Sequence, residues 1–281
     1  MNEYVITEET ISMFKDYLKS EEKSDNTIEK YIRDVRAFSV YANNSNITKE
    51  MVVSYKNKLF ADNYAVRSIN SMIASLNNLF GFIGRDDCKV KSMKLQRQIY
   101  CSEEKELTKT EYIRLINTAK QKSNERLCLL IQTICGTGIR VSELQHITVE
   151  ALKRGEAVVS MKGKIRTVFI VRELKKKLLR YANEHGIKEG AVFITRNGKP
   201  MNRTNIWREM KKLCQQANVN PDKVFPHNLR HLFAKTFYGI EKDIVKLSDI
   251  LGHSSINTTR IYIVTSGYEH RKRMESMRLI L

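Results

Sequence analysis

The sequence predicts a mainly α-helical protein with a small antiparallel β-sheet in its C-terminal domain, which is an α+β organisation. Two patterns predict this class: apolar residues recur at helical spacing over most of the 281 residues, and two short β-branched runs flank one glycine turn. The length exceeds the usual size of one compact unit, so we expect two domains. Hydrophobic residues make up 42% of the chain, with only 3 prolines and 12 glycines, which is typical of a regularly folded protein.

The beginning of the chain has the pattern of a four-helix unit. Apolar positions at helical spacing mark residues 9–22, 26–43, 48–61 and 66–84. Asp25 or Asn26 is a suitable N-cap for the second of these helices, and Thr48 is one for the third. We therefore expect an N-terminal helical domain over residues 1–87.

Helical periodicity stops between residues 86 and 104. Lys89, Lys91, Lys94 and Arg97 lie in this stretch without an acidic residue between them. We interpret residues 88–104 as an interdomain linker. A run of like charge in a linker is commonly only solvated, and contact with a DNA backbone is the alternative.

The second domain, residues 105–281, combines helical and strand patterns. Helical spacing marks residues 108–120, 126–135, 205–217, 227–238, 243–251, 258–264 and 269–281. Strand-like runs at 157–161 and 166–171 are separated by a turn that contains Gly163, which predicts a hairpin. A further apolar run at 191–195 precedes a turn with Gly198 and is a candidate third strand.

Positive charge is concentrated in the second part of the chain. Residues 1–100 hold 15 basic and 13 acidic residues, whereas residues 101–281 hold 34 and 18, for a net charge of +18. Such a surface attracts a polyanion, either nucleic acid or an anionic membrane face, and a basic protein without such a partner is the alternative. No run approaches the roughly 20 apolar residues of a membrane span, and the polar start is no signal peptide, so we expect a cytoplasmic location.

The cysteines predict neither disulfides nor a metal site. They are odd in number and scattered, with no CxxC pair and no histidine at ligand spacing. We interpret all of them as reduced thiols: Cys88, Cys101, Cys128, Cys135 and Cys214.

Three segments concentrate arginine, histidine and tyrosine. Their sequences are GTGIRVSEL at 136–144, HNLRH at 227–231, and LGHSS at 251–255, which leads on to Tyr262. A transferring phosphoryl group needs its oxygens neutralised, and guanidinium groups do this bidentately without losing their charge. Two arginines, Arg140 and Arg230, are enough to bind both non-bridging oxygens. Taken singly, each residue also fits an ordinary structural role.

Together and in this order, the segments resemble the motifs of the tyrosine recombinase, or phage integrase, family. The resemblance covers residues 107–281. TGIRVSEL at 137–144 is similar to the first arginine box of the family, HNLRH to its HxLRH box, and LGHS with Tyr262 nine positions after His253 to its last box. The helical first part is similar to the SAM-like core-binding domain of these enzymes. Helices that begin within the first dozen residues indicate a short, two-domain member.

The resemblance implies a role for each matching residue. Tyr262 would attack a DNA phosphate and form a 3′-phosphotyrosyl ester. Arg140 and Arg230 would bind the non-bridging oxygens, His227 would be a general base or hydrogen-bond donor, and His253 would donate to a phosphate oxygen.

The resemblance also implies a lysine that protonates the departing 5′-oxygen from a β-hairpin. The family often has a GKGxKxR pattern there, and the corresponding run, MKGKIR at 161–166, is one residue shorter. Alignment from Arg166 favours Lys164, with Lys162 as the alternative. Glu143 either orients Arg140 or forms a surface salt bridge.

We therefore expect a site-specific DNA recombinase that is either the integrase or excisionase of a mobile element or an Xer-like resolvase. A type IB topoisomerase-like enzyme and a catalytically silent DNA-binding protein are the alternatives. No cofactor is expected, because the ester retains the bond energy and the sequence has neither a P-loop nor an acidic metal cluster.

The expected partner is double-stranded DNA, without a membrane. We expect a monomer that assembles into a homotetramer on two duplexes, with an accessory protein or partner recombinase as a further candidate. The amphipathic segment 269–281 either packs on its own domain or docks on a neighbouring protomer.

Overall fold

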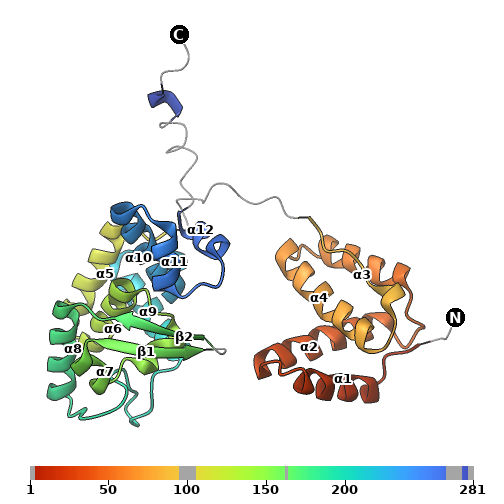
Figure 1. Ribbon diagram of the computed structural model, residues 1–281, viewed down its shortest axis with the longest axis horizontal. Helices are drawn as coiled ribbons and strands as arrows, with labels where there is room; N and C mark the ends of the chain where they lie inside the picture. The colour runs from red at the N-terminus through yellow and green to blue at the C-terminus, as the bar shows by residue number, and fades with distance from the viewer. Residues whose placement is uncertain (1–3, 95–105, 162–163, 264–273, 278–281) are drawn as a thin grey trace. The chain divides into compact units, whose positions relative to one another are not determined.

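The computed structural model describes residues 4–94, 106–161, 164–263 and 274–277. It divides the chain into two compact units, Met1–Arg97 and Gln98–Leu281. Both are helical, and the two-stranded sheet belongs to the second unit (Figure 1). The predicted fold class, mainly α with a small antiparallel sheet, is therefore confirmed.

The first unit is a four-helix bundle. Its helices are α1 (Glu8–Ser20), α2 (Asp25–Ala42), α3 (Lys49–Ala61) and α4 (Val66–Phe82), followed by the 3₁₀ turn η1 (Asp86–Cys88). Thr48 caps α3 as predicted, because its hydroxyl accepts a hydrogen bond from the backbone N–H of Met51. The cap position of α2 is Ser24, one residue before the predicted cap.

The core of this unit extends into the segment predicted as a linker. Phe14, Phe38 and Phe80 are fully buried between the helices, and Cys88 and Val90 join the same cluster. The side chain of Asn77 accepts from the backbone N–H of Val90 and donates to its carbonyl, at 3.1 and 2.9 Å. The chain after α4 is thus fixed along that helix before the segment 95–105, which lies outside the described residues.

The second unit contains more helices than the sequence analysis predicted. Its elements are α5 (Lys109–Gln121), α6 (Glu125–Thr137), η3 (Val141–His146), α7 (Val149–Arg154), β1 (Glu156–Met161), β2 (Lys164–Phe169), α8 (Arg172–Glu184), α9 (Arg203–Ala217), η4 (Pro221–Lys223), α10 (Pro226–Glu241), α11 (Ile244–Leu251) and α12 (Ile256–Ile263). Helices α7 and α8 were not predicted. The first is short, and the second carries a run of three lysines that hides its buried apolar stripe.

The candidate third strand at 191–195 is wrong. The described sheet has two strands, and Ala191 and Ile194 form only isolated bridges with Thr148 and Pro200. The physical reason is a local turn: Thr195 donates to the carbonyl of Lys199, so the run closes on itself instead of extending along the hairpin.

The hairpin presents one apolar face to the core. Val159 pairs with Arg166 across the two strands, and Ala157, Val159 and Val168 are buried. Phe169 and Ile165 lie on the exposed side. Arg166 is therefore a charged residue at an inward-facing position of a strand. The central helix α6 packs against α5, α8 and α10 and brings the end of its last turn towards α11.

Among the described residues, no helix combines the length and apolarity that crossing a membrane would require. Cys88, Cys128 and Cys214 are buried free thiols and Cys135 is a partly buried one. Cys101 lies outside the described residues.

Candidate active site

The ends of four helices position the residues that the motifs single out. Gly138 directly follows the last residue of α6 and has φ +63°, and an added Cβ there would lie 2.5 Å from a ring carbon of Phe233. Glycine at this position therefore lets the chain turn closely against α10 towards Arg140. Pro226 begins α10, where its missing N–H breaks no helical hydrogen bond.

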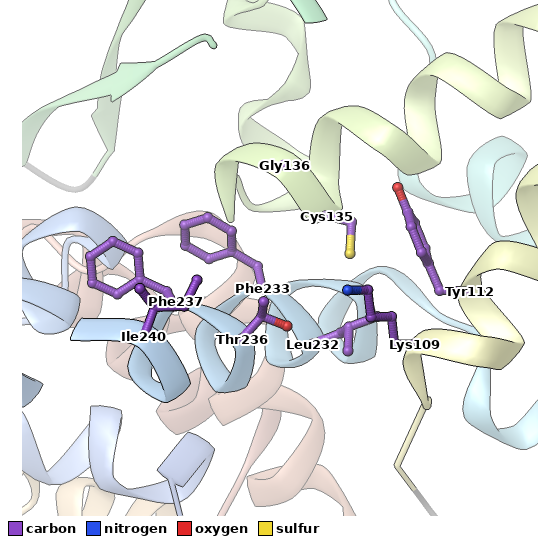
Figure 2. Close-up of a pocket in the computed structure, with 9 residues that line it drawn as sticks. All are labelled: Lys109, Tyr112, Cys135, Gly136, Leu232, Phe233, Thr236, Phe237 and Ile240. Atoms are coloured by element: carbon purple, nitrogen blue, oxygen red, sulfur yellow. The ribbon is translucent and has the colours of Figure 1, made fainter. Parts of the chain in front are cut away.

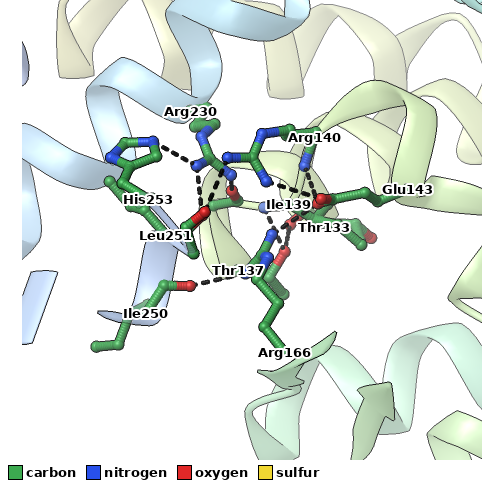
Figure 3. A network of polar contacts seen from close by, with 12 residues as sticks. Thr133, Thr137, Ile139, Arg140, Glu143, Arg166, Arg230, Ile250, Leu251 and His253 are labelled. Atoms are coloured by element: carbon green, nitrogen blue, oxygen red, sulfur yellow. Dashed lines mark hydrogen bonds and ion pairs between the residues drawn. The ribbon is translucent and has the colours of Figure 1, made fainter. Parts of the chain in front are cut away.

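The guanidinium of Arg230 is anchored by carbonyl groups at the ends of two helices. Arg230 is 2% exposed, and it donates to the carbonyls of Gly138 after α6 and of Leu251 at the end of α11 (Figure 3). Carbonyls at a helix C-terminus are free of helical partners and carry partial negative charge, so they stabilise a buried cation. Burial, and next the charge of Arg140, lower the pKa of Arg230 to about 10, so it remains charged at neutral pH.

Arg140 is more accessible than Arg230. Its side chain is 35% exposed, and its guanidinium donates to Glu143 at 2.9 Å and to the carbonyl of Gly252 at 3.2 Å. The backbone N–H of Arg140 also donates to Glu143, at 2.9 Å. Arg140 can thus reach a ligand from the open side while its other edge is held by the protein.

Glu143 is fully buried and binds two arginines. Besides Arg140, it accepts from the guanidinium of Arg166 at 2.6 Å. Burial disfavours the ionised carboxylate, but the hydrogen bonds from Arg140 and the charge of Arg166 outweigh it, so the pKa of Glu143 is lowered. Of the two sequence interpretations, a surface salt bridge is wrong and an orienting role agrees with these contacts.

Tyr262 lies among three imidazole rings. The ring is 4% exposed, and its centroid is 5.5 Å from those of His227 and His253 and 5.2 Å from that of His231. His231 Nε2 donates to the backbone carbonyl of Tyr262 at 3.2 Å, which attaches α12 to α10. The Tyr262 phenol lies near enough to Arg230 that its electrostatic interaction partly offsets the lowering of the arginine pKa.

The contacts of His253 define its tautomer. Nε2 lies 2.9 Å from a guanidinium nitrogen of Arg230, which can only donate, so Nε2 accepts. Nδ1 therefore carries the proton and donates to the hydroxyl of Thr259 at 2.8 Å. Burial and the charges of the neighbouring arginines lower the pKa of His253 to about 4. The ring is neutral at pH 7.

Five of the six predicted catalytic side chains are brought together in this way. They are Arg140, His227, Arg230, His253 and Tyr262. The sixth, Lys164, is the first residue of β2 and pairs with Met161, and its side chain is not among those described. Lys162, the alternative, lies outside the described residues.

The neutral histidines predict that acid destabilises the protein. The pKa of His253 is about 4 in the folded state and near 6.5 in an unfolded chain. Between these values the unfolded chain binds more protons, so the free energy of unfolding falls as pH is lowered from about 6.5 to 4. Over this pH range, we expect the free energy of unfolding of His253→Gln to fall by about 1–3 kcal/mol less than that of the wild-type protein. Chemical denaturation at several pH values measures this difference.

The control for this prediction is His146→Gln, which changes a histidine in η3 outside the group of three imidazole rings around Tyr262. This variant should retain the wild-type dependence of stability on pH. An unchanged dependence in His253→Gln would contradict the electrostatic description of the site.

Two residues of this network were not found from the sequence. Thr259 binds His253, and Arg166 binds Glu143 and, at 2.7 Å, the carbonyl of Ile250. The strand pattern contained a signal for Arg166, because this residue alternates with the buried Val168, and a charged residue on an inward face requires a partner. Thr259 gave no comparable signal.

Comparisons with known proteins find similarity over both units of the chain. Residues 105–267 match the model of the phage integrase family, and residues 11–86 match that of its N-terminal SAM-like domain. The tyrosine recombinase XerA of Pyrococcus furiosus is 28% identical over 290 residues, which covers 100% of this chain and 98% of that protein.

Solved structures of similar fold include the crystal structure of XerA recombinase, with a TM-score of 0.54 and 25% identity over 98% of this chain and all of the other. The lambda integrase tetramer bound to a Holliday junction has a TM-score of 0.75 and 16% identity, over 93% of this chain and 78% of the other, and it supports the fold alone.

Proposed function

Because the chain belongs to the phage integrase family, we propose that it is a site-specific DNA recombinase that works through a 3′-phosphotyrosyl intermediate. The observation that carries this proposal is a phenol set beside a buried guanidinium and among imidazole rings. Such a site contains a nucleophile, a proton acceptor and positive charge for the phosphate, which are the components that covalent catalysis on a phosphodiester needs.

The first step transfers a DNA phosphate to Tyr262. The phenol loses its proton as its oxygen bonds to phosphorus, and the bond to the 5′-oxygen breaks. His227 is suited to accept the proton, because burial and then the charge of Arg230 lower its pKa and leave it neutral at pH 7. Arg140 and Arg230 bind the two non-bridging oxygens. Rejoining reverses the step, with the 5′-hydroxyl of the partner strand as nucleophile.

His253 and Lys164 complete the proposal. In the free protein, Nε2 of His253 accepts from Arg230. When Arg230 turns to the bound phosphate, Nε2 can take up a proton from solvent, which the negative charge of the phosphate favours, and then donate to a phosphate oxygen. Lys164 stands at the start of β2, two residues before Arg166, and is proposed to protonate the departing 5′-oxygen.

Double-stranded DNA is the proposed substrate. The net charge of +18 favours a polyanion, and the solved relatives include XerH bound to its difH substrate. We propose residues 1–87 as the core-binding domain and 105–281 as the catalytic domain, joined by 88–104. Full-length similarity to proteins named XerA favours an Xer-type resolvase over a mobile-element integrase.

The proposal is tested with nicked suicide duplexes taken from the flanking genome and incubated with the protein in EDTA. We expect a covalent protein–DNA band that maps to Tyr262. Relaxation of supercoils without recombination would favour the topoisomerase-like alternative. DNA binding without any adduct would favour the catalytically silent one.

We further propose assembly into a tetramer through the C-terminal segment 269–281. Of this segment the structure describes residues 274–277, in which Met274 and Met277 are exposed. A candidate receptor is an apolar cavity of about 300 Å³ between α5, α6 and α10, which Phe233, Phe237 and Ile240 help to line (Figure 2).

Deletion of residues 269–281 should abolish tetramers on DNA while the protein still folds. Ile240→Asp should weaken assembly in the same way, because it places a charge at the rim of the cavity on a residue that is 82% exposed. Size-exclusion chromatography with light scattering on the DNA complex measures both effects. Val245→Asp, at an exposed position outside the cavity, is the control, and intact tetramers in the truncated protein would contradict docking.

A further inference from the structure

Arg166 occupies an unusual position for a charged residue. It lies on the inward face of β2, opposite the buried Val159, and its side chain is only 11% exposed. A buried guanidinium is costly unless its N–H groups are paired. The hydrogen-bond partners of the Arg166 guanidinium therefore indicate the role of this residue.

Arg166 shares one hydrogen-bond partner with Arg140 and passes beside the residue that provides the other. One guanidinium nitrogen of Arg166 donates to Glu143, the carboxylate that binds Arg140. The side chain also crosses Gly252, whose carbonyl is the second acceptor of Arg140, so closely that an added Cβ would lie 2.2 Å from Cδ of Arg166. Figure 3 shows Arg140 and Arg166 on the same carboxylate, that of Glu143. Because both arginines also lie against Gly252, the four residues form a closed ring of contacts.

A further bond fixes the Gly252 side of this ring. The other terminal nitrogen of Arg166 donates to the carbonyl of Ile250 at 2.7 Å, near the end of α11. Gly252 follows this helix with φ +63°, and Leu251 between them binds Arg230. Arg166 therefore holds the turn on which both other arginines depend.

Arg166 also limits how Glu143 can bind Arg140. One carboxylate oxygen accepts from the Arg140 guanidinium, while the other is taken by Arg166 and the Arg140 backbone. Arginine and carboxylate favour two parallel hydrogen bonds when both oxygens are free. Without Arg166, Glu143 would bind two nitrogens of Arg140 and draw its guanidinium away from Gly252 and the open side.

We propose that Arg166 is a positioning residue, which keeps the Arg140 guanidinium free to receive a phosphate by occupying one oxygen of Glu143 and fixing the turn at Gly252. The inference deepens the proposed recombinase function and rests on it. Arg166 itself touches no substrate in this proposal and acts through Glu143 and the backbone of α11.

The first test is Arg166→Met in single-turnover cleavage of the suicide duplex that the wild-type protein cuts. We expect cleavage at saturating DNA to slow about 10- to 100-fold, the range for a small misplacement of a reacting group. The Kd for DNA should change by less than about threefold, because displacing one phosphate contact removes little of the total electrostatic binding.

A matched control is available in the same unit. Arg126 also bridges a carboxylate and a carbonyl, those of Glu209 at 2.7 Å and Ile194 at 3.0 Å, and its side chain is 29% exposed. Arg126→Met should be destabilised in a similar way and yet cleave at the wild-type rate. If cleavage slows equally in both variants, the slowing in Arg166→Met comes from a general loss of stability, and the proposal is wrong.

A second substitution separates positioning from structural support. Glu143→Gln in the Arg166→Met background removes the negative charge that would capture Arg140, so the double variant should cleave several-fold faster than Arg166→Met alone. A residue that only supported the fold would show the opposite, because the double variant loses more contacts. A double variant no faster than the single one would count against the proposal.

A modified substrate distinguishes Arg140 from the hairpin lysine as the group affected. A duplex with sulfur in place of the bridging 5′-oxygen needs no general acid, because a thiol has a pKa near 8.5 and leaves readily as the thiolate. We expect Arg166→Met to remain slow on this duplex. Recovery of the wild-type rate would show that Arg166 acts on leaving-group protonation, and the proposal would be wrong.

A crystal structure of Arg166→Met tests the geometry without reference to activity. We expect both terminal nitrogens of Arg140 to bind Glu143 and the contact with the Gly252 carbonyl to break. An unchanged Arg140 would overturn the inference even if the protein is a recombinase. Conversely, if the wild-type protein forms no adduct, the proposed function is wrong, but the crystal structure still shows whether Arg166 positions Arg140.

Discussion

Tyr262→Phe is expected to abolish the covalent protein–DNA adduct and to leave DNA binding intact. The substitution removes only the phenolic oxygen, which is the proposed nucleophile, so cleavage should fall by at least about 10⁴-fold. The ring lies 4% exposed among three imidazoles, and phenylalanine retains those contacts. Adduct formation on a suicide duplex and the Kd for DNA measure the two parts of this prediction.

The control for this prediction is Tyr238→Phe. Tyr238 lies on the same helix as His227 and Arg230 and packs against the cluster that contains Tyr262. Loss of its hydroxyl should leave the adduct at the wild-type level. If Tyr262→Phe still forms an adduct, another residue is the nucleophile and the mechanism proposed for this site is wrong.

The second large effect is expected for Arg140→Lys, which should bind DNA but cleave it about 10²- to 10³-fold more slowly. Arg140 binds Glu143 and the Gly252 carbonyl along one part of its guanidinium and leaves the rest accessible. An ammonium group retains the charge but has no planar fork, so it cannot bind these groups and a phosphate with the same geometry. Single-turnover cleavage at saturating DNA measures the effect.

Arg126→Lys is the matched control, since Arg126 makes an equivalent pair of contacts with Glu209 and Ile194. It should cleave DNA at the wild-type rate. A wild-type rate in Arg140→Lys would contradict the proposal that two guanidinium groups bind the phosphate.

Much of the fold could be predicted because it follows from local pattern. The four helices of the first unit and the hairpin have apolar periods of 3.6 and 2 that are visible in the sequence. Helix α8 was missed because three consecutive lysines interrupt its apolar pattern, although Leu174, Leu178 and Tyr181 form its buried stripe. The third strand was predicted in error, since an apolar run alone does not reveal whether its backbone pairs with a neighbour or with its own turn.

The candidate reactive groups could be predicted from the sequence, because they lie in short motifs that are visible along the chain. Arg230 and His231 follow His227 by three and four positions on α10, so each lies about one turn from His227 whatever packs against the helix. Only the tertiary structure decided how these groups are held. Arg230 meets the carbonyl of Gly138, and Arg166 that of Ile250, across 92 and 84 positions of the chain. No local period determines such pairs, because they depend on how α6, β2 and α11 pack. Packing makes Arg166, which the sequence showed only as part of the hairpin pattern, a central contact of the site.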